Sequence, residues 1–313
     1  PYPIYNRELR YSEVDMTLNG GLGAVTANKA IVLQDNVGEK VSATRHANNS
    51  DVWVMTHSGI NSNFHAFLVT AAGVTMTPVN TAIGNSCNQS SSGFSDKGIV
   101  RFSYNGCKLL HNSRSSNWLQ LFDFDNSTGI VTNLIMTDNS ISSPHSAEFS
   151  PDHTKLYVSF KGFFALGAKV SYQYDLTAAN LPASKVQLTS GVDLVGLQMA
   201  PDGKIYGSTR WGTTLHVIDS PNSLGTACNL IQDAININTT GGNNTTGTEF
   251  PQRVPGLESD FEWSGNCGDE YTFSIIDTFP VLMDAVSWDF GDPASGADNF
   301  SSERAPAHTF SGL

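Results

Sequence analysis

The sequence predicts an all-β fold, with a β-propeller in residues 1–264 and a second strand-rich module in residues 265–313. Charged residues make up 15% of the 313 residues, well below the roughly 25% of an average soluble protein. Ser, Thr, Asn and Gly take their place, and these residues favour turns and short strands. Because no stretch shows sustained helical periodicity, we expect the secondary structure to be strands.

An internal repeat is the observation that indicates a propeller. Similar segments begin at residues 102, 149 and 199, which are 47 and 50 residues apart, and read FSYNGCKLL, FSPDHTKLY and MAPDGKIY. Each unit continues to a strand that ends at an aspartate, namely Asp123, Asp175 and Asp219. Several short strands within a period of about 40 to 50 residues are typical of propeller blades. An aspartate repeated in every blade indicates architecture, since its carboxylate can accept backbone N–H bonds in the following turn.

The repeat places the elements in order along the chain. Four complete blades are expected at residues 40–86, 97–139, 145–191 and 194–238. In the second blade, the four strands are predicted at residues 98–104, 108–110, 119–125 and 130–137. Pro151 and Asp152 predict a tight turn between the first two strands of the third blade, because Pro presets φ and Asp bonds its own backbone. Such small sheets bury their faces by stacking on one another.

Residues before and after these blades predict an incomplete ring. Residues 9–17 and 24–33 should be the two outer strands of a blade that lacks its inner pair, and residues 254–263 should be a closing inner strand. A ring of four and a half blades does not close well. We therefore expect about four to five visible blades of a larger ring, within a longer protein.

Charge and motifs exclude several functions. The net charge is −12 with no local basic cluster, so a nucleic acid is not expected as a partner. No apolar run reaches about 18 residues, so no transmembrane segment is predicted. The chain has no G-x-S-x-G, no H-E-x-x-H and no phosphate-binding loop, and we predict no catalytic residue and no enzymatic activity. We interpret the eight histidines as packed or surface residues: His46, His57, His65, His111, His145, His153, His216 and His308.

The cysteines form no zinc-type pattern. Cys87, Cys107, Cys228 and Cys267 are disulfide candidates, because an even count suits an oxidising compartment. Cys87–Cys107 is the first pairing to test, since both lie near one proposed strand pair. The alternative is four free or buried thiols, because connectivity cannot be deduced from spacing.

The best candidates for ligand binding lie in the loops between the second and third strands of the blades. These loops share one face of a propeller, and they should place five side chains around one rim: Trp118, Phe163, Phe164, Arg210 and Trp211. Aromatic residues with an arginine are suited to stack on sugars or to anchor protein partners. The alternative is that Trp118 and Trp211 pack between blades.

The run Val286–Asp292 (VSWDFGD), with Pro306–Phe310 (PAHTF), resembles the polycystic kidney disease (PKD) domain. The resemblance implies an immunoglobulin-like β-sandwich that is C-terminally incomplete in this chain, with the Trp and Phe of the first run facing inward. Asp289, Asp292 and Asp298 could hold a calcium ion through hard oxygen ligands. The alternative is that they only form turns. No other cofactor is expected.

The preceding residues resemble the region before PKD modules in Bacteroidetes gliding motility-associated surface proteins. Five stretches carry this resemblance: Leu9–Gly23, Asn49–Val54, Phe64–Val69, Phe122–Gly129 and Pro221–Cys228. It implies an extra blade and a half before residue 9, an extracellular or outer-surface location, and export by the type IX secretion machinery.

These observations favour a secreted, non-catalytic module for adhesion or ligand binding, whose partner is a glycan or a protein. A structural scaffold in a large surface protein is the first alternative, and a polysaccharide-degrading propeller is the second. Exposed, clustered rim aromatics would favour binding, and burial between blades would favour a scaffold.

Overall fold

The computed structural model describes residues 7–48, 50–87, 98–160, 170–192, 194–209, 211–237, 250, 261–265, 270–275 and 286–311. The chain divides into two compact units, Pro1–Pro255 and Gly256–Leu313. Each unit is described by itself below.

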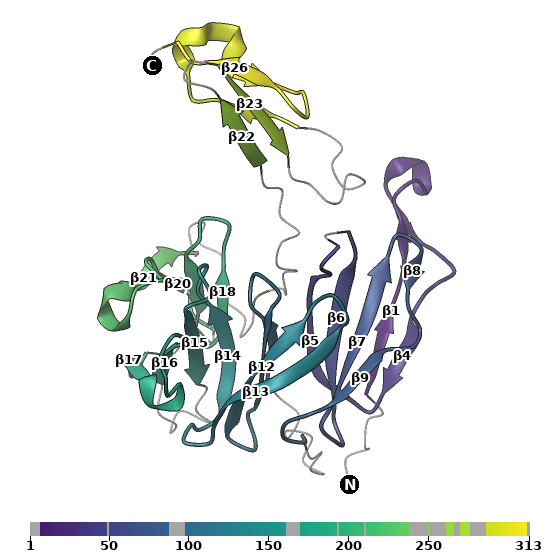
Figure 1. Ribbon diagram of the computed structural model, residues 1–313, viewed down its shortest axis with the longest axis vertical. Coiled ribbons are helices and arrows are strands. Elements are labelled where there is room, and N and C mark those ends of the chain that lie inside the picture. Colours follow the sequence, from purple (N-terminus) through teal and green to yellow (C-terminus); the bar gives the residue numbers. More distant parts are fainter. Residues whose placement is uncertain are drawn as a thin grey trace. The chain divides into compact units, whose positions relative to one another are not determined.

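The first unit is built from four antiparallel sheets whose strands follow one another in chain order (Figure 1). The first sheet contains β5 (Val37–Arg45), β6 (Val52–Ser58), β7 (Asn63–Thr70), β8 (Gly73–Val74) and β9 (Val79–Ala82), the last two both pairing with β7. The second contains β10 (Val100–Phe102), β11 (Lys108–Ser113), β12 (Trp118–Asp125) and β13 (Ile130–Asp138). The third contains β14 (Pro144–Phe149), β15 (Lys155–Phe160), β16 (Val170–Asp175) and β17 (Val186–Ser190). The fourth contains β18 (Leu197–Met199), β19 (Ile205–Ser208), β20 (Thr214–Ile218) and β21 (Leu230–Asn236).

These sheets match the four predicted ranges, except that β5 begins at Val37, ahead of the predicted residue 40, and β14 begins at Pro144, ahead of the predicted residue 145. The first unit thus has a propeller-like all-β fold. Contacts join β5 with β10, β11 with β14, and β14 with β18, so each sheet adjoins the next one in the chain. Helical structure in the described residues is limited to short 3-10 turns, as the missing helical periodicity predicts. None of those described turns has the length and hydrophobicity needed to cross a bilayer.

Apolar cores lie between successive sheets, because alternate side chains of a strand point to opposite faces. Leu109 packs in a cluster with Trp53 and Phe64 of the first sheet. Its neighbour Leu110 packs with Phe149 of the third sheet. The second and third sheets are therefore buried on both faces, which explains why β11, β12 and β15 are nearly continuous runs of buried residues.

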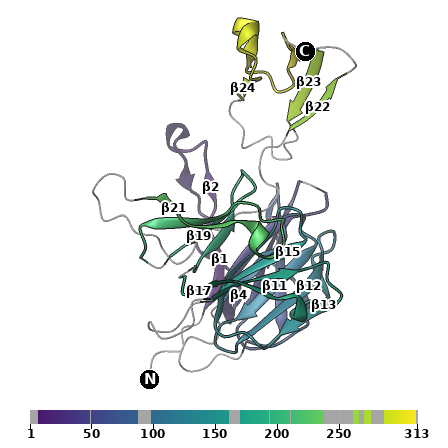
Figure 2. The ribbon, with the colours of Figure 1, turned by 90° about the vertical axis from the view of Figure 1, so that its left-hand side faces the viewer.

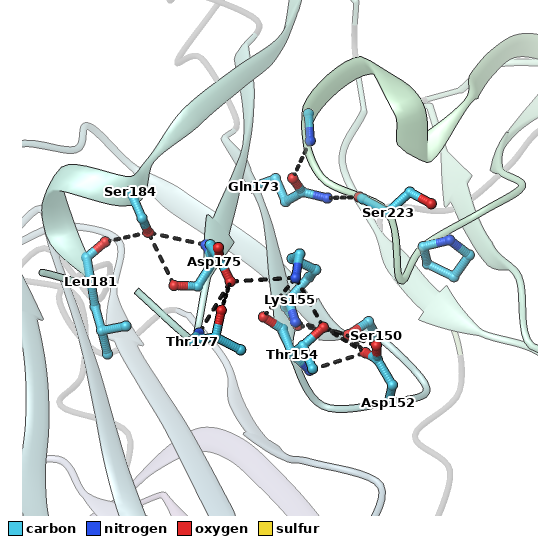
Figure 3. A network of polar contacts seen from close by, with 12 residues as sticks. Ser150, Asp152, Thr154, Lys155, Gln173, Asp175, Thr177, Leu181, Ser184 and Ser223 are labelled. Atoms are coloured by element: carbon cyan, nitrogen blue, oxygen red, sulfur yellow. Dashed lines mark hydrogen bonds and ion pairs between the residues drawn. The ribbon is translucent and has the colours of Figure 1, made fainter. Parts of the chain in front are cut away.

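The repeated aspartates form ion pairs with lysines of the neighbouring strand. Asp123 lies 3.0 Å from Lys108, Asp175 lies 3.3 Å from Lys155 and Asp219 lies 2.6 Å from Lys204, measured between carboxylate oxygen and Nζ. Figure 3 shows the third-sheet pair, with the Asp175 carboxylate also accepting hydrogen bonds from the backbone and hydroxyl of Thr177. The predicted backbone hydrogen bond is therefore found at Asp175, whereas the Asp123 and Asp219 carboxylates contact side chains, namely those of Asn133 and Asn229 besides the two lysines.

The Pro151–Asp152 turn forms where the sequence predicts it. The Asp152 carboxylate accepts hydrogen bonds from the hydroxyl of Ser150 and from the backbone N–H of Thr154 (Figure 3). These bonds hold the chain reversal between β14 and β15.

A two-stranded ribbon precedes the four sheets. It pairs β1 (Glu8–Tyr11) with β4 (Ile31–Asp35) and β2 (Val14–Asp15) with β3 (Ala24–Val25). Figure 2 shows β2 leading into the 3-10 turn η1 (Asn19–Gly21) at the tip of the ribbon. The predicted strands at residues 9–17 and 24–33 are thus each divided in two.

The second unit is also built from strands. A three-stranded sheet has the order β22 (Phe261–Gly265), β23 (Glu270–Ile275) and β26 (Ala307–Thr309), and β24 (Trp288–Asp289) pairs with β25 (Phe300–Ser301). The predicted closing strand at residues 254–263 is wrong for residues 261–263, because β22 pairs with β23 of this unit. The 3-10 turn η5 (Pro293–Asn299) connects β24 to β25.

Aromatic side chains cluster in the second unit. The ring of Phe273 lies 5.7 Å from that of Trp288 and 5.2 Å from that of Phe290, between centroids. The ring of His308 stacks on Phe290 at 4.3 Å. Trp288 and Phe290 lie two residues apart, the strand spacing that places side chains on one face.

Candidate functional site

Of the two predicted rim aromatics that the structure describes, Trp211 is exposed. It lies in the turn between β19 and β20, the residue is 69% exposed, and its backbone has a left-handed φ of +57°. The turn is compact: a Cβ atom added to Gly212 would lie 1.5 Å from Oγ1 of Thr209. A tight turn thus presents a large aromatic surface to solvent.

Trp118 is not a rim residue, which corrects the prediction. It begins β12, is 4% exposed, and packs edge-on against His111 with 4.9 Å between ring centroids. Nζ of Lys40, from the first sheet, lies 5.9 Å from the centroid of the Trp118 ring. Trp118 therefore packs where the first two sheets meet. Phe163, Phe164 and Arg210 lie outside the described residues.

The candidate Cys87–Cys107 disulfide does not form, and the described cysteines follow the alternative of free thiols. Cys87, Cys107 and Cys228 are free thiols, and the two members of the predicted pair lie in different environments. Cys87 is buried beside Lys40 and His111. Cys107 is exposed in the turn between β10 and β11. Cys267 lies outside the described part of the chain.

A buried cluster of His57, Cys87, His111 and Lys40 is the most chemically concentrated site in the described residues. One nitrogen of each histidine and the Cys87 sulfur all lie within 4.8 Å of one another. Sγ of Cys87 is 3.6 Å from Nε2 of His111. His57 is the last but one residue of β6, His111 lies in β11, and Cys87 lies on the segment after β9, so three separate parts of the chain supply these atoms.

Lys40 binds the cluster from β5. Its Nζ lies 2.9 Å from Nε2 of His111, and it donates to Sγ of Cys87 at 3.3 Å and to the Asn112 carbonyl oxygen at 2.6 Å. These three acceptors match the three N–H bonds of an ammonium group.

Both imidazoles of the cluster are neutral. Burial, helped by the positive charge of Lys40, lowers the pKa of His57 to about 3. Burial also lowers the pKa of His111 well below its usual range, with Lys40 and His57 adding to the effect. A neutral imidazole keeps a lone pair on one nitrogen, which makes each ring a potential metal ligand.

The sequence did not reveal this cluster. Positions 40, 57, 87 and 111 form no short-range motif, and the sequence alone indicates packed or surface histidines. The one available signal is that His57 and His111 both fall near the ends of the second strands of consecutive blades. Such a pair converges only after the blades are stacked.

The predicted calcium ligands do not gather. The Asp292 carboxylate accepts a 2.8 Å hydrogen bond from the Ser311 backbone N–H and lies 3.2 Å from Nε2 of His308. Asp289 accepts from the Gly291 backbone N–H at 3.0 Å and from Nδ2 of Asn299 at 2.9 Å. Within the described residues, the sole metal-type group of three side chains is the buried histidine–cysteine cluster, so Asp289, Asp292 and Asp298 are not brought together.

No protein-family model matches the chain. No curated protein matches its sequence. Among solved structures, a candidate 6-phosphogluconolactonase from Bacteroides fragilis NCTC 9343 is 12% identical, covers 72% of this chain and 64% of its own, and has a TM-score of 0.47. A candidate 6-phosphogluconolactonase from Bacteroides uniformis ATCC 8492 is 14% identical, with 56% and 49% covered and a TM-score of 0.40.

The Dos1 propeller is 11% identical, with 69% of this chain and 54% of that chain covered and a TM-score of 0.42. The chain spans less than two thirds of the length of each of these three structures.

Proposed function

We propose that the first unit is a non-catalytic, propeller-like binding module and that a glycan or protein ligand contacts it at Trp211. The exposure of Trp211 is the observation that carries the proposal. Tryptophan offers a large rigid contact surface and is enriched among the residues that dominate binding energy. A left-handed backbone costs a side-chain-bearing residue about 1–2 kcal/mol, and such strain tends to persist at ligand sites.

The absence of catalysis is part of the proposal. Its support is the sequence, which lacks the nucleophile, metal-protease and phosphate-loop motifs. The buried histidine–cysteine cluster does not present a reactive group at the surface, since His57, Cys87 and His111 are each at most 2% exposed.

We further propose an extracellular or outer-surface location with type IX export, and a PKD-like sandwich in the second unit acting as a spacer. The sequence resemblance to gliding motility-associated proteins supports the location. Free thiols at Cys87, Cys107 and Cys228 lend it no support, so it rests on that resemblance alone. The aromatic packing of Trp288 and Phe290 is compatible with the inward residues of a PKD motif.

A structural scaffold is the second candidate, and the burial of Trp118 favours it. A scaffold needs aromatic residues between its sheets and none on its rim. Trp211 is the residue that separates the two candidates.

The test is a glycan-array and cell-binding screen of the full chain, repeated with Trp211→Ala. Leu224→Ala is the matched control, because Leu224 is 52% exposed but lies in the turn after β20, outside the predicted rim. We expect Trp211→Ala to weaken binding about 30-fold, the effect of losing a residue worth ~2 kcal/mol, and Leu224→Ala to leave it unchanged.

Thermal unfolding of each variant checks that the fold survives. Equal losses in both variants, or none in Trp211→Ala, would remove Trp211 from the site. A wild-type chain that binds no glycan and no cell surface would favour the scaffold.

A further inference from the structure

We propose that the protein binds one zinc-class divalent metal ion between its first and second sheets, with His57, Cys87 and His111 as ligands. This inference is independent of ligand binding at Trp211. Imidazole nitrogen and thiolate sulfur are the donors that zinc prefers in proteins. All three residues are buried, and as three protein ligands they would leave one position of a tetrahedral ion open.

The measured spacing fits a shared ion. Zinc bonds of about 2.3 Å to sulfur and about 2.0–2.1 Å to nitrogen place the two donor atoms roughly 3.6 Å apart at a tetrahedral angle. Sγ of Cys87 and Nε2 of His111 are 3.6 Å apart. The third donor, a ring nitrogen of His57, lies within 4.8 Å of both of these atoms. A modest movement of the side chains would therefore bring all three donors within bonding distance of one ion.

His57 is oriented as a metal ligand would be. Its Nδ1 lies 2.7 Å from the Ser58 carbonyl oxygen, which places a proton on Nδ1 and the lone pair on Nε2. Metal-bound histidines commonly donate their other N–H to a carbonyl in this way. Nε2 of His57 is buried and has no hydrogen-bond partner. A buried polar atom without a partner requires an explanation, and a metal ion supplies one.

In the metal-free protein, Nζ of Lys40 occupies the position of the ion. Its Nζ lies within hydrogen-bond distance of both Cys87 and His111, so its positive charge faces two of the three donor atoms. A divalent ion would displace Nζ from these two atoms, while the Asn112 carbonyl could continue to accept from it. Lys40 and the metal therefore compete for one position.

The site would join elements that are distant in sequence. His57 belongs to the first sheet and His111 to the second, and Cys87 lies on the segment between them. An ion bound to all three would connect the two sheets, and binding energy for the folded site would add to stability.

The test is a titration of the chelator-stripped full chain with Co²⁺, a spectroscopic substitute for Zn²⁺. We expect one ion per chain, a thiolate-to-cobalt charge-transfer band, and a higher melting temperature with Zn²⁺. Cys87→Ser should abolish the band, and His57→Gln should weaken binding at least about 100-fold, since even groups that only orient a ligand are worth 10–100-fold.

Cys228→Ser is the matched control, because Cys228 is a second buried thiol and lies in the 3-10 turn η3 (Gly225–Cys228), away from the cluster. It should leave the band intact, as should the exposed Cys107→Ser. A band that survives in Cys87→Ser, or a wild-type chain that binds no ion, would overturn the proposal.

Lys40→Met tests the competition without removing a ligand. We expect metal binding to tighten about tenfold or more, because a positive charge beside the ion is removed. Unchanged or weaker binding in a Lys40→Met variant that melts cooperatively would show that Lys40 does not occupy the metal position.

Discussion

Gly129 shows how one missing side chain allows two sheets to meet. It lies in the turn after β12 with φ of +77°, and a Cβ atom there would lie 2.7 Å from the ring of Trp53. The indole N–H of Trp53 donates to the Asn126 carbonyl oxygen at 2.9 Å, which fixes the ring against the turn. Trp53 belongs to the first sheet, so this glycine is needed for contact between sheets as well as for the turn.

We predict that Gly129→Ala lowers the free energy of unfolding by about 2–4 kcal/mol, from backbone strain and a clash with a packed ring. Gly191→Ala is the control, since Gly191 has φ of +84° but nothing within 4 Å of an added Cβ. It should cost about 1 kcal/mol, from strain alone. Urea unfolding of both variants measures the difference, and equal costs would show that the Trp53 contact does not limit this position.

The Asp138 carboxylate, at the end of β13, connects this strand to residues of the third sheet and the segment before β17. Asp138 accepts hydrogen bonds from the Tyr174 hydroxyl at 2.8 Å and from Nζ of Lys185 at 2.9 Å. The backbone N–H of Ser140 donates to the same carboxylate at 2.7 Å. Burial alone would raise the pKa of Asp138, but these hydrogen bonds together hold it below its usual value.

This lowered pKa gives a pH-dependent contribution to stability. A carboxyl group whose pKa falls on folding stabilises the protein above its unfolded pKa, about 3.9, and the contribution is lost as pH falls below that value. We predict that Asp138→Asn costs about 2 kcal/mol near neutral pH. The cost should shrink as the pH is lowered through the range below about 4. Urea unfolding at several pH values measures it, and a cost that does not change with pH would contradict the assignment.

Strands were the elements best predicted from sequence. In the second sheet, strands expected at residues 108–110 and 119–125 are observed as Lys108–Ser113 and Trp118–Asp125. The alternation of residues and the turn signals are local, so they can be read along the chain. The strand expected at residues 254–263 failed because pairing with β23 depends on a partner that local pattern does not identify.

Across the first unit, a buried ion pair and a hydrogen bond connect the second, third and fourth sheets. Nη1 of Arg101, in β10, lies 3.5 Å from the Glu148 carboxylate in β14. The same carboxylate accepts a 3.2 Å hydrogen bond from the backbone N–H of Met199 in β18. Both charged side chains are less than a tenth exposed, so each depends on the other for charge compensation.

We predict that Glu148→Gln alone costs about 3–5 kcal/mol of unfolding free energy, because it leaves Arg101 buried without a countercharge. The double variant Arg101→Met with Glu148→Gln should be more stable than the sum of the single effects by at least about 1 kcal/mol. Denaturant unfolding of the wild type, the two single variants Glu148→Gln and Arg101→Met, and the double variant measures this coupling. Additive costs would show that the two groups are not coupled.

The candidate sites were less predictable than the fold, for a physical reason. The exposure of Trp211 follows from its place in a turn, which sequence can indicate. The burial of Trp118 and the meeting of His57 with His111 depend on how two sheets stack, and each sheet's pattern is compatible with several stackings. Side chains from two sheets come together only in the folded molecule, so a pair such as His57 and His111 cannot be read from either strand alone.

The alternation of Leu109 and Leu110 between two cores has a consequence for how the chain tolerates change in length. Each residue of β11 is assigned to one neighbouring sheet by whether its position is odd or even. One inserted residue would reverse this parity for all the residues that follow in the strand, so both interfaces would receive the wrong side chains together. Two inserted residues would restore it. The turns carry no such parity, and they are therefore where length can vary one residue at a time.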